Sequence, residues 1–481
     1  MVHDGKFIVP GVRNGNVYLG LEPDRGKHEK AEQLTHDPDL SPPHQYLAYY
    51  RWISRVFGTD IHVHMGTHGS CEWLPGKGNG LSAGCSPDIM MEDMPHLYAY
   101  VIDDPSEGIV AKRRKRAVLV DHMMPALTRA GTYEGLADLE GLIQQYLFCK
   151  HTKQQGKMRD IAEGIHRSVS DLSMWKELGL EEGSSPEDVA ARSEMILDYL
   201  ADLKDGLITD GLHVMGKVPE GRRMTEMVYC LTRLRNGGIP SLRAVIAEGM
   251  GYDLDALLDD ASGTVPATGE LNLTALDRVD SQAMDLIESM QAADFDPKEC
   301  AALAEGVLPG SSEAGALVRY ITDDLVPRIR GISDEIGNML HGMGGGYVPP
   351  GPSGSPTRGN AHLLPTGRNY YSLDPETVPT QESWKTGSRM AEDMVSKYVD
   401  REGRYPESIA IVVWSVDTMK TGGDDVAYIM RLLGVRPTWG SVGGKVTGLE
   451  VIPCAELGRP RIDVTVRISS RSGTPSPTCS N

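Results

Sequence analysis

The segment over residues 60–77 limits what this chain can fold into more than any other. Residues 60–64 alternate between polar and apolar side chains, and this pattern predicts a half-buried strand. The strand leads into a stretch that contains Gly66 and Gly69, and glycine disfavours a continuous helix because it is flexible. A strand that ends in a functional loop is typical of α/β folds. We therefore predict an α/β unit with a site on this loop.

Two histidines and a glutamate stand four residues apart in this segment: His64, His68 and Glu72, with His62 nearby as a fourth candidate. Neutral imidazole and carboxylate groups bind divalent metals and accept protons near neutral pH. The spacing differs from the zincin pattern H-E-x-x-H. Unrelated surface or core histidines are the alternative interpretation. We predict His64 and His68 as metal ligands or proton acceptors, and Glu72 as catalytic base or metal ligand.

The length of the chain, 481 residues, predicts more than one structural unit, because single hydrophobic cores stop growing at about 250–300 residues. We predict an α/β multidomain fold in which α/β units flank a mainly helical middle region. The first α/β unit, with the His/His/Glu site, is residues 1–135, the helical region is 136–343, and the second α/β unit is 344–469. Residues 470–481 read as an aberrant tail without apolar residues to pack.

Local patterns support this organisation. Residues 185–203 carry helical periodicity, and Ser185, which precedes a proline, predicts an N-cap with proline at the first helical position. Strand patterns at 408–414 and 462–468 enclose a helical pattern at 424–433. Strand, helix and strand at these lengths predict a βαβ unit in a parallel sheet.

Charge and cysteine content narrow the possible functions. A net charge of −19 argues against a nucleic-acid partner, because binding phosphates requires a basic face. The sequence has no run of about 20 apolar residues, so we predict no membrane span. Seven cysteines without a C-x-x-C pair, and a start without an apolar signal stretch, predict a cytoplasmic protein with reduced thiols. The pattern G-x-x-x-x-G-K-[ST] is absent, so we predict no P-loop nucleotide site in this chain.

A basic run over residues 112–116 stands out in this acidic sequence. One interpretation is a solvated helix face. The other is a site that attracts the carboxylates of a substrate, because arginine binds a carboxylate through two parallel hydrogen bonds.

The segment over residues 60–77 resembles the signature of the large subunits of ATP-dependent tetrapyrrole metal chelatases, the cobaltochelatase and magnesium chelatase group. Asp104 and Ser106 depart from the family's usual pattern. The resemblance continues through ordered blocks over residues 85–88, 103–108, 111–114, 120–122, 127–131, 345–352, 364–369, 414–419, 433–437 and 458–463.

The resemblance implies a large catalytic subunit that inserts Co²⁺ into a corrin precursor in cobalamin (vitamin B12) biosynthesis. It also implies partner AAA-type ATPase subunits that hydrolyse the ATP. A magnesium chelatase that inserts Mg²⁺ into protoporphyrin IX is the alternative within the family, although imidazole ligands favour a later transition metal. Two further possibilities are a truncated, non-catalytic tetrapyrrole-binding fragment and a stand-alone metal-dependent hydrolase.

The resemblance also places residues around the tetrapyrrole substrate. Arg113 and Arg114 match a family block and are expected to bind ring carboxylates. The full predicted substrate-binding set is Lys112, Arg113, Arg114, Glu107, His122, Arg129, Arg368 and Asn369.

The large chain of the resembled family is longer, with sequence on both sides of the residues present here. The family pattern expected after residue 469 is missing, and residues 470–481 stand in its place. We expect a partial chain with a shift of reading frame near codon 470, which genomic reads would test.

Overall fold

The computed structural model describes residues 2–25, 40–78, 80–129, 134–151, 155–181, 183–372, 374–440 and 444–468. The predicted aberrant tail lies outside these residues. The described chain combines helices with several small sheets, so the predicted mixed α/β class is confirmed.

Contacts between residues divide the chain into two compact units. Unit 1 comprises residues 1–124, 214–217 and 329–481, and unit 2 comprises residues 125–213 and 218–328. Unit 1 is therefore built from segments far apart in the sequence. The boundaries predicted at residues 135 and 343 stay a prediction.

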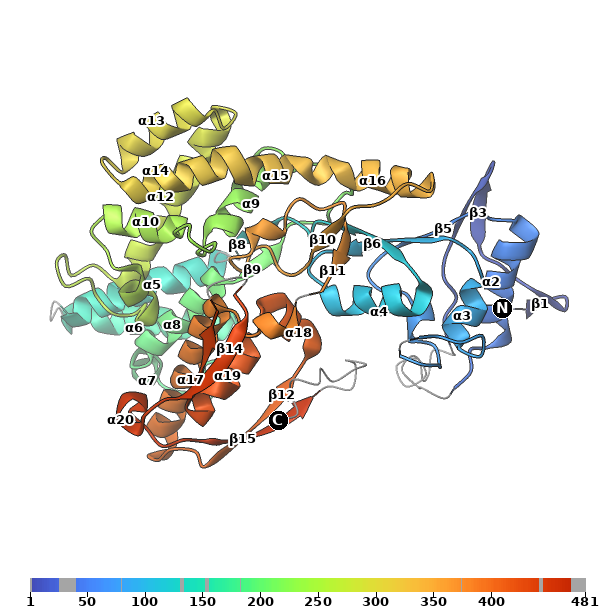
Figure 1. Cartoon of the computed structure of the whole chain (residues 1–481). Helices are drawn as coiled ribbons and strands as arrows, with labels where there is room; N and C mark the ends of the chain where they lie inside the picture. Colours follow the sequence, from blue (N-terminus) through green and yellow to red (C-terminus); the bar gives the residue numbers. More distant parts are fainter. Residues whose placement is uncertain are drawn as a thin grey trace. The chain divides into compact units, whose positions relative to one another are not determined.

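A three-stranded parallel sheet carries the predicted site in unit 1. Its order is β5 (His62–Met65), β6 (His96–Val101) and β7 (Val118–His122). Helix α4 (Pro105–Lys115) connects β6 to β7 and lies beside β6 (Figure 1). Because the strands are parallel, the loops that follow β5 and β6 leave the sheet at the same edge.

Strand β6 is buried on both faces, as expected for the central strand of a parallel sheet. Tyr98 and Tyr100 pack on one face with Ala111 of α4. Leu97 and Ala99 point to the other face and pack in a separate cluster of buried residues. This alternation fixes the register of β6, since a shift by one residue would exchange the two faces.

The remaining elements before residue 372 in unit 1 are short. They are β1 (Val2–His3), β2 (Lys6–Phe7), β3 (Gly11–Asn14), β4 (Val17–Gly20), α2 (His44–Arg51) with the π-helical turn Trp52–Phe57, α3 (Ser86–Met91), α16 (Asp334–Met343), β10 (Pro350–Pro352) and β11 (Asn369–Tyr371). Strands β10 and β11 pair in parallel.

The predicted βαβ unit is present at the end of the described chain. Strands β12 (Ser408–Val413) and β15 (Asp463–Ile468) pair in parallel, with Ser408 opposite Asp463. Between them in the sequence lies α19 (Asp424–Leu433), where a helix is predicted, and α17 (Gln381–Glu402) packs against it. The other elements here are α18 (Ser415–Thr421), β13 (Val435–Trp439), β14 (Val446–Val451) and α20 (Cys454–Leu457).

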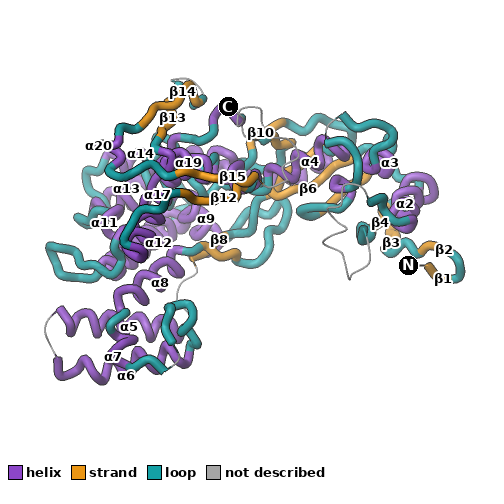
Figure 2. Tube along the Cα trace, turned by 90° about the horizontal axis from the view of Figure 1, so that it is seen from below, coloured by secondary structure: helices purple, strands orange, loops and turns teal. Residues whose placement is uncertain are grey.

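Unit 2 is mainly helical. Figure 2 shows α5 (Glu134–His151), α6 (Gln155–Asp171) and α7 (Pro186–Ala190) as neighbouring helices. The Ser185 side chain caps α7 by accepting a hydrogen bond from the backbone N–H of Asp188 at 3.1 Å, as its position before a proline predicts. The predicted helix over 185–203 is divided, because α7 ends at Ala190 and α8 begins at Ser193.

The core of this helical group is apolar, and Ile143, Ile165 and Ile196 from α5, α6 and α8 are fully buried in it. The other elements of unit 2 are α8 (Ser193–Asp205), β8 (Leu127–Arg129), β9 (Leu207–Thr209), α9 (Arg222–Thr232), α10 (Leu242–Gly249), α11 (Leu254–Asp259), α12 (Asn272–Ala292), α13 (Pro297–Val307) and α14 (Ser312–Tyr320). Helix α15 (Val326–Arg330) joins unit 2 to unit 1. Each helix in the described part of the chain is either too short or too polar to cross a membrane.

A buried carboxyl group joins β7 to a distant segment. The Asp121 side chain is fully buried, and its Oδ1 accepts a hydrogen bond from the backbone N–H of Arg368 at 2.6 Å. The backbone N–H of Asp121 donates to the carbonyl of Arg368 at 3.0 Å. Burial raises the pKa of Asp121 to about 7, so this carboxyl holds its proton over a pH range in which an exposed aspartate has lost it.

Replacing Asp121 is expected to change how the free energy of unfolding depends on pH. Between about pH 4 and pH 7 the folded chain binds one more proton at Asp121 than the unfolded chain, so rising pH lowers the free energy of unfolding. Asp121→Asn keeps an acceptor for the backbone N–H of Arg368 but cannot ionise. At pH 8 its free energy of unfolding is therefore expected to exceed that of wild type by at most about 4 kcal/mol, the cost of ionising Asp121 in the folded chain. Urea unfolding at pH 5 and pH 8 measures this difference, with the exposed Asp393→Asn as control. Equal pH slopes for Asp121→Asn and wild type would contradict the prediction.

Candidate functional site

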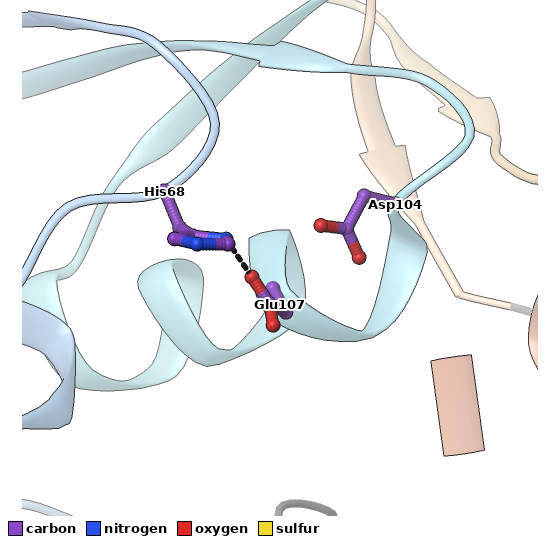
Figure 3. Close-up of side chains that lie close together, drawn as sticks. All are labelled: His68, Asp104 and Glu107. Atoms are coloured by element: carbon purple, nitrogen blue, oxygen red, sulfur yellow. Dashed lines mark ion pairs between the residues drawn. The ribbon is translucent and has the colours of Figure 1, made fainter. Parts of the chain in front are cut away.

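Three side chains that bind metals in many proteins meet at the edge of the sheet in unit 1. His68 lies in the loop after β5, Asp104 is the N-cap residue of α4, and Glu107 is in the first turn of α4. Each offers one ligand atom, and these atoms lie within 4.8 Å of one another. Figure 3 shows the three side chains pointing toward one another, with an ion pair between His68 and Glu107.

The local structure explains this meeting. Proline at the first position of α4 fixes where the helix begins, so Asp104 stands at its N-terminus. Glu107 follows three residues later and lies on the same side of the helix. Since the loops after β5 and β6 leave the sheet at the same edge, His68 approaches both carboxylates.

The electrostatics of this group combine a solvent-facing imidazole with two partly shielded carboxylates. The His68 side chain is 55% exposed, and that of Glu107 is 16% exposed. The hydrogen bond to Glu107 raises the pKa of His68 above its ordinary value. Burial, followed by repulsion from Glu107, raises the pKa of Asp104 to about 6. The group therefore combines nitrogen and oxygen donors, and its most exposed member is the His68 imidazole.

A second charged group lies buried behind the loop, centred on the Lys115 ammonium. Lys115 Nζ is 3.5 Å from Glu72 Oε2 and 3.1 Å from His64 Nδ1, and the Lys115 and Glu72 side chains are wholly buried. Although burial disfavours the charged amine, the Glu72 carboxylate raises the pKa of Lys115 above its usual range. Burial, helped by the charge of Lys115, lowers the pKa of His64 to about 4, so this imidazole is neutral.

Glu22 completes the buried group from the opposite side. Its Oε1 accepts hydrogen bonds from the hydroxyls of Tyr46 at 2.7 Å and Tyr50 at 2.5 Å, and its Oε2 accepts one from the backbone N–H of Ser70 at 2.8 Å. Its Oε2 also lies 4.0 Å from His64 Nε2. Burial alone would raise the pKa of Glu22, but the charge of Lys115 and the hydrogen bonds from Tyr50 and Ser70 lower it to about 2.

The Glu72 carboxylate, which is buried, and the Glu22 carboxylate, which is partly buried, both hold the loop that carries His68. Glu72 Oε1 accepts hydrogen bonds from the backbone N–H of Gly69 at 3.0 Å and from the Tyr98 hydroxyl at 3.2 Å. Position 69 also requires glycine, because a Cβ there would collide with the His64 ring and with the Glu22 carboxylate. The loop is thus fixed directly after His68.

The structure divides the predicted trio between two places. His64 and Glu72 share the buried Lys115, whereas His68 lies with Asp104 and Glu107. Across the described ranges, the latter is the group whose ligand atoms are close enough to share one ion. His62 lies partly buried next to His64, and its removal from solvent lowers its pKa to about 3. The catalytic and metal-binding roles assigned to the trio stay predictions.

The basic run is used mainly within the fold. Arg114 donates hydrogen bonds to the carbonyls of Glu72 at 2.8 Å and Leu74 at 2.7 Å, and Lys112 donates to the carbonyl of Tyr370 at 2.8 Å. Arg113 is exposed and makes no hydrogen bond or ion pair with the described residues, so it is available for a ligand.

The other predicted substrate residues are distributed more widely. His122 is the last residue of β7, and its ring Nδ1 donates a hydrogen bond to the Met123 carbonyl at 2.9 Å. Arg368 pairs with Asp121 through its backbone, and Asn369 Oδ1 accepts a hydrogen bond from the backbone N–H of Leu119 at 3.2 Å. Arg129 is the last residue of β8, and its side chain lies outside the described structure.

Sequence reasoning missed three members of these groups. Lys115 belongs to a basic run that favours a solvent-facing interpretation, although a lysine in such a run can turn inward when its helix packs on a sheet. Asp104 stands out in the sequence only as a departure from a family pattern, yet its position before a proline is an N-cap signal that could have placed it next to Glu107. Glu22 carries no signal in its own segment.

Comparison with known proteins decides the family. The family described as CobN/Magnesium Chelatase matches residues 1–472 of this chain. The chain belongs to the CobN/magnesium chelatase family. This confirms the resemblance read from the motifs around the His/His/Glu segment.

Two relatives illustrate the range of this family. The aerobic cobaltochelatase subunit CobN of Sinorhizobium sp is 38% identical over 97% of this chain and 38% of its own length. A magnesium-chelatase subunit of Chlorobaculum parvum is 33% identical over 96% of this chain and 36% of its own length.

A solved structure has the same fold. The catalytic subunit of cobaltochelatase from Mycobacterium tuberculosis matches with a TM-score of 0.81 and 38% identity, and the match covers 96% of this chain and 38% of that protein. The chain thus spans less than two-fifths of the length of these CobN/magnesium chelatase relatives.

The buried ion pair between Lys115 and Glu72 leads to a prediction for the stability of the chain. Lys115→Met removes the ammonium and leaves the buried Glu72 and the partly buried Glu22 without a counter-charge, which is expected to cost about 3–5 kcal/mol. Thermal unfolding followed by circular dichroism measures the loss. Adding Glu72→Gln to this variant should recover part of it, because one uncompensated charge is then removed.

The exposed Arg113→Met is the matched control within the same helix, and its effect should stay within about 0.5 kcal/mol. If Lys115→Met and Arg113→Met lowered the free energy of unfolding equally, the prediction that the buried Lys115 ammonium stabilises the fold would be wrong.

Proposed function

We propose that this chain is the tetrapyrrole-binding part of the large subunit of a cobaltochelatase, which inserts Co²⁺ into a corrin precursor in cobalamin biosynthesis. The observation that carries the proposal is the match to cobaltochelatase subunits over almost the whole chain, at 38% identity in both sequence and structure comparisons. The donor chemistry at the sheet edge supports it, because imidazole favours later transition metals such as Co²⁺.

Metal insertion requires that the ring lose two pyrrole N–H protons as it takes up a divalent ion. Solvent-facing imidazole and carboxylate groups suit the exchange of an ion and of protons. His68 and Glu107 are exposed enough to meet a bound ring. His64 and Glu72 are buried around Lys115, and we assign them the positioning of the loop that carries His68.

Substrate binding is proposed to use the exposed guanidinium of Arg113. Tetrapyrrole precursors carry carboxylates at the ring edge, and an exposed arginine can bind a carboxylate bidentately. Lys112 and Arg114 stabilise this region by donating hydrogen bonds to the backbone carbonyls of Tyr370 and Glu72, respectively. ATP hydrolysis is assigned to AAA-type partner subunits, since the sequence has no P-loop pattern.

A magnesium chelatase that acts on protoporphyrin IX is the second candidate. It is favoured by the 33% identity to the magnesium-chelatase relative of Chlorobaculum parvum. The lower identity and the imidazole at the sheet edge make it the weaker of the two.

Fluorescence quenching on titration with a metal-free corrin precursor, and separately with protoporphyrin IX, tests the proposal with the chain itself. Saturable binding with preference for the corrin is expected for a cobaltochelatase, and preference for protoporphyrin would point to the magnesium enzyme. Arg113→Ala should weaken corrin binding about tenfold, the effect of one lost charged hydrogen bond.

The exposed Arg404→Ala is the matched control and should bind like wild type. A folded sample that binds neither tetrapyrrole would contradict the proposal. Activity toward a hydrolysable substrate without ATP or tetrapyrrole would favour a metal-dependent hydrolase instead.

A further inference from the structure

We propose that His68, Asp104 and Glu107 form a binding site for one divalent transition-metal ion on this chain. That the ion is the metal delivered to the ring rests on the function proposed above. The binding itself does not, because it needs neither tetrapyrrole nor ATP.

The spacing of the three side chains suits a single ion. Nitrogen and oxygen ligands bind first-row divalent ions at about 2.0–2.2 Å, so ligand atoms around one ion are about 3 Å apart when adjacent and about 4.3 Å apart when opposite. The three potential ligand atoms lie within 4.8 Å of one another. Small rotations of the side chains therefore suffice to bring all three onto an ion.

The bonding of Asp104 is a second, independent observation. Its Oδ1 is buried and accepts no hydrogen bond from the described residues. A buried carboxylate oxygen without a donor is costly, and a cation in contact with it would remove the cost. This oxygen belongs to the residue that also stands next to Glu107 and His68 (Figure 3).

The charges around the group favour a cation. Two carboxylates contribute, and Asp103 adds a third negative charge nearby. Lys420, the protonated form of His68 in its ion pair with Glu107, and the N-terminal end of α4 oppose them. The helix end is equivalent to about half a positive charge, so the balance stays negative.

His64 and Glu72, the other two members of the predicted trio, are poorly placed to bind a metal ion. The Lys115 ammonium lies 3.5 Å from Glu72 and 3.1 Å from His64 Nδ1, where it repels a cation and occupies the imidazole lone pair. The group at His68 instead presents its imidazole to solvent, from which an ion can enter.

The donor set also indicates which ions are preferred. One imidazole and two carboxylates suit Co²⁺, Fe²⁺ or Zn²⁺, whereas Mg²⁺ prefers oxygen ligands alone. Three protein ligands leave further positions open on the ion. An ion held in this way keeps exchangeable water ligands and remains accessible to a second ligand such as a ring nitrogen.

The test is titration of the full 481-residue chain with CoCl₂, followed by calorimetry and by the visible absorption of bound Co²⁺, with no tetrapyrrole or ATP present. Wild type should bind one Co²⁺ saturably. His68→Ala, Asp104→Asn and Glu107→Gln should each weaken binding about tenfold or more, and His68→Ala should also change the visible spectrum because a nitrogen ligand is lost. An equal concentration of MgCl₂ should not displace Co²⁺.

The matched controls are Asp103→Asn, which removes a neighbouring negative charge but no ligand, and His44→Ala, which removes an exposed histidine elsewhere. Both should bind Co²⁺ within about twofold of wild type. Thermal unfolding of every variant confirms that it is folded. Wild-type binding in all three ligand variants, or equal losses in the controls, would overturn the site.

The outcome separates this site from the proposed function. Co²⁺ binding that depends on the three residues, in a chain that binds no tetrapyrrole, would support the site and contradict the chelatase. Corrin binding together with Co²⁺ binding that ignores all three substitutions would support the chelatase and overturn the site.

Discussion

The buried ammonium of Lys115 is the interaction on which the candidate site depends. Removing an ammonium from water costs several kcal/mol unless opposite charges accompany it. Glu72 and Glu22 supply those charges from segments 43 and 93 residues away in the sequence, and each also accepts a backbone N–H of the loop that holds His68. The charge thus fixes the loop and leaves its histidine, His68, exposed to solvent.

Much of the fold could be predicted from the sequence, because periodicity reports local structure. The strand expected at 60–64 is β5, and the expected strand–helix–strand pattern at 408–468 is a parallel pair with α19 between the strands in the sequence. The site could be predicted only in part. Spacing alone placed His64, His68 and Glu72 together, whereas the change from strand to loop after β5 sends His68 away from the other two.

The comparisons and the geometry support each other at different levels. Family membership rests on a match along the chain and indicates tetrapyrrole metal chelation as the chemistry to test. The geometry adds which residues can meet solvent and which cannot. Within the basic run, Arg113 is exposed to solvent, whereas Arg114 and Lys115 bond to Glu72 inside the fold. The run therefore contributes both to the surface and to the packing of the interior.

The backbone pairing of Asp121 with Arg368 has a consequence for the order of folding during synthesis. The two residues are 247 positions apart, and ribosomes add about 5–20 residues per second, so β7 waits roughly 12–50 s for its partner segment. The helices of unit 2 are made during that interval and bury their core through contacts closer in sequence. The helical unit is therefore expected to form before the contact between Asp121 and Arg368, which joins β7 to its distant partner segment.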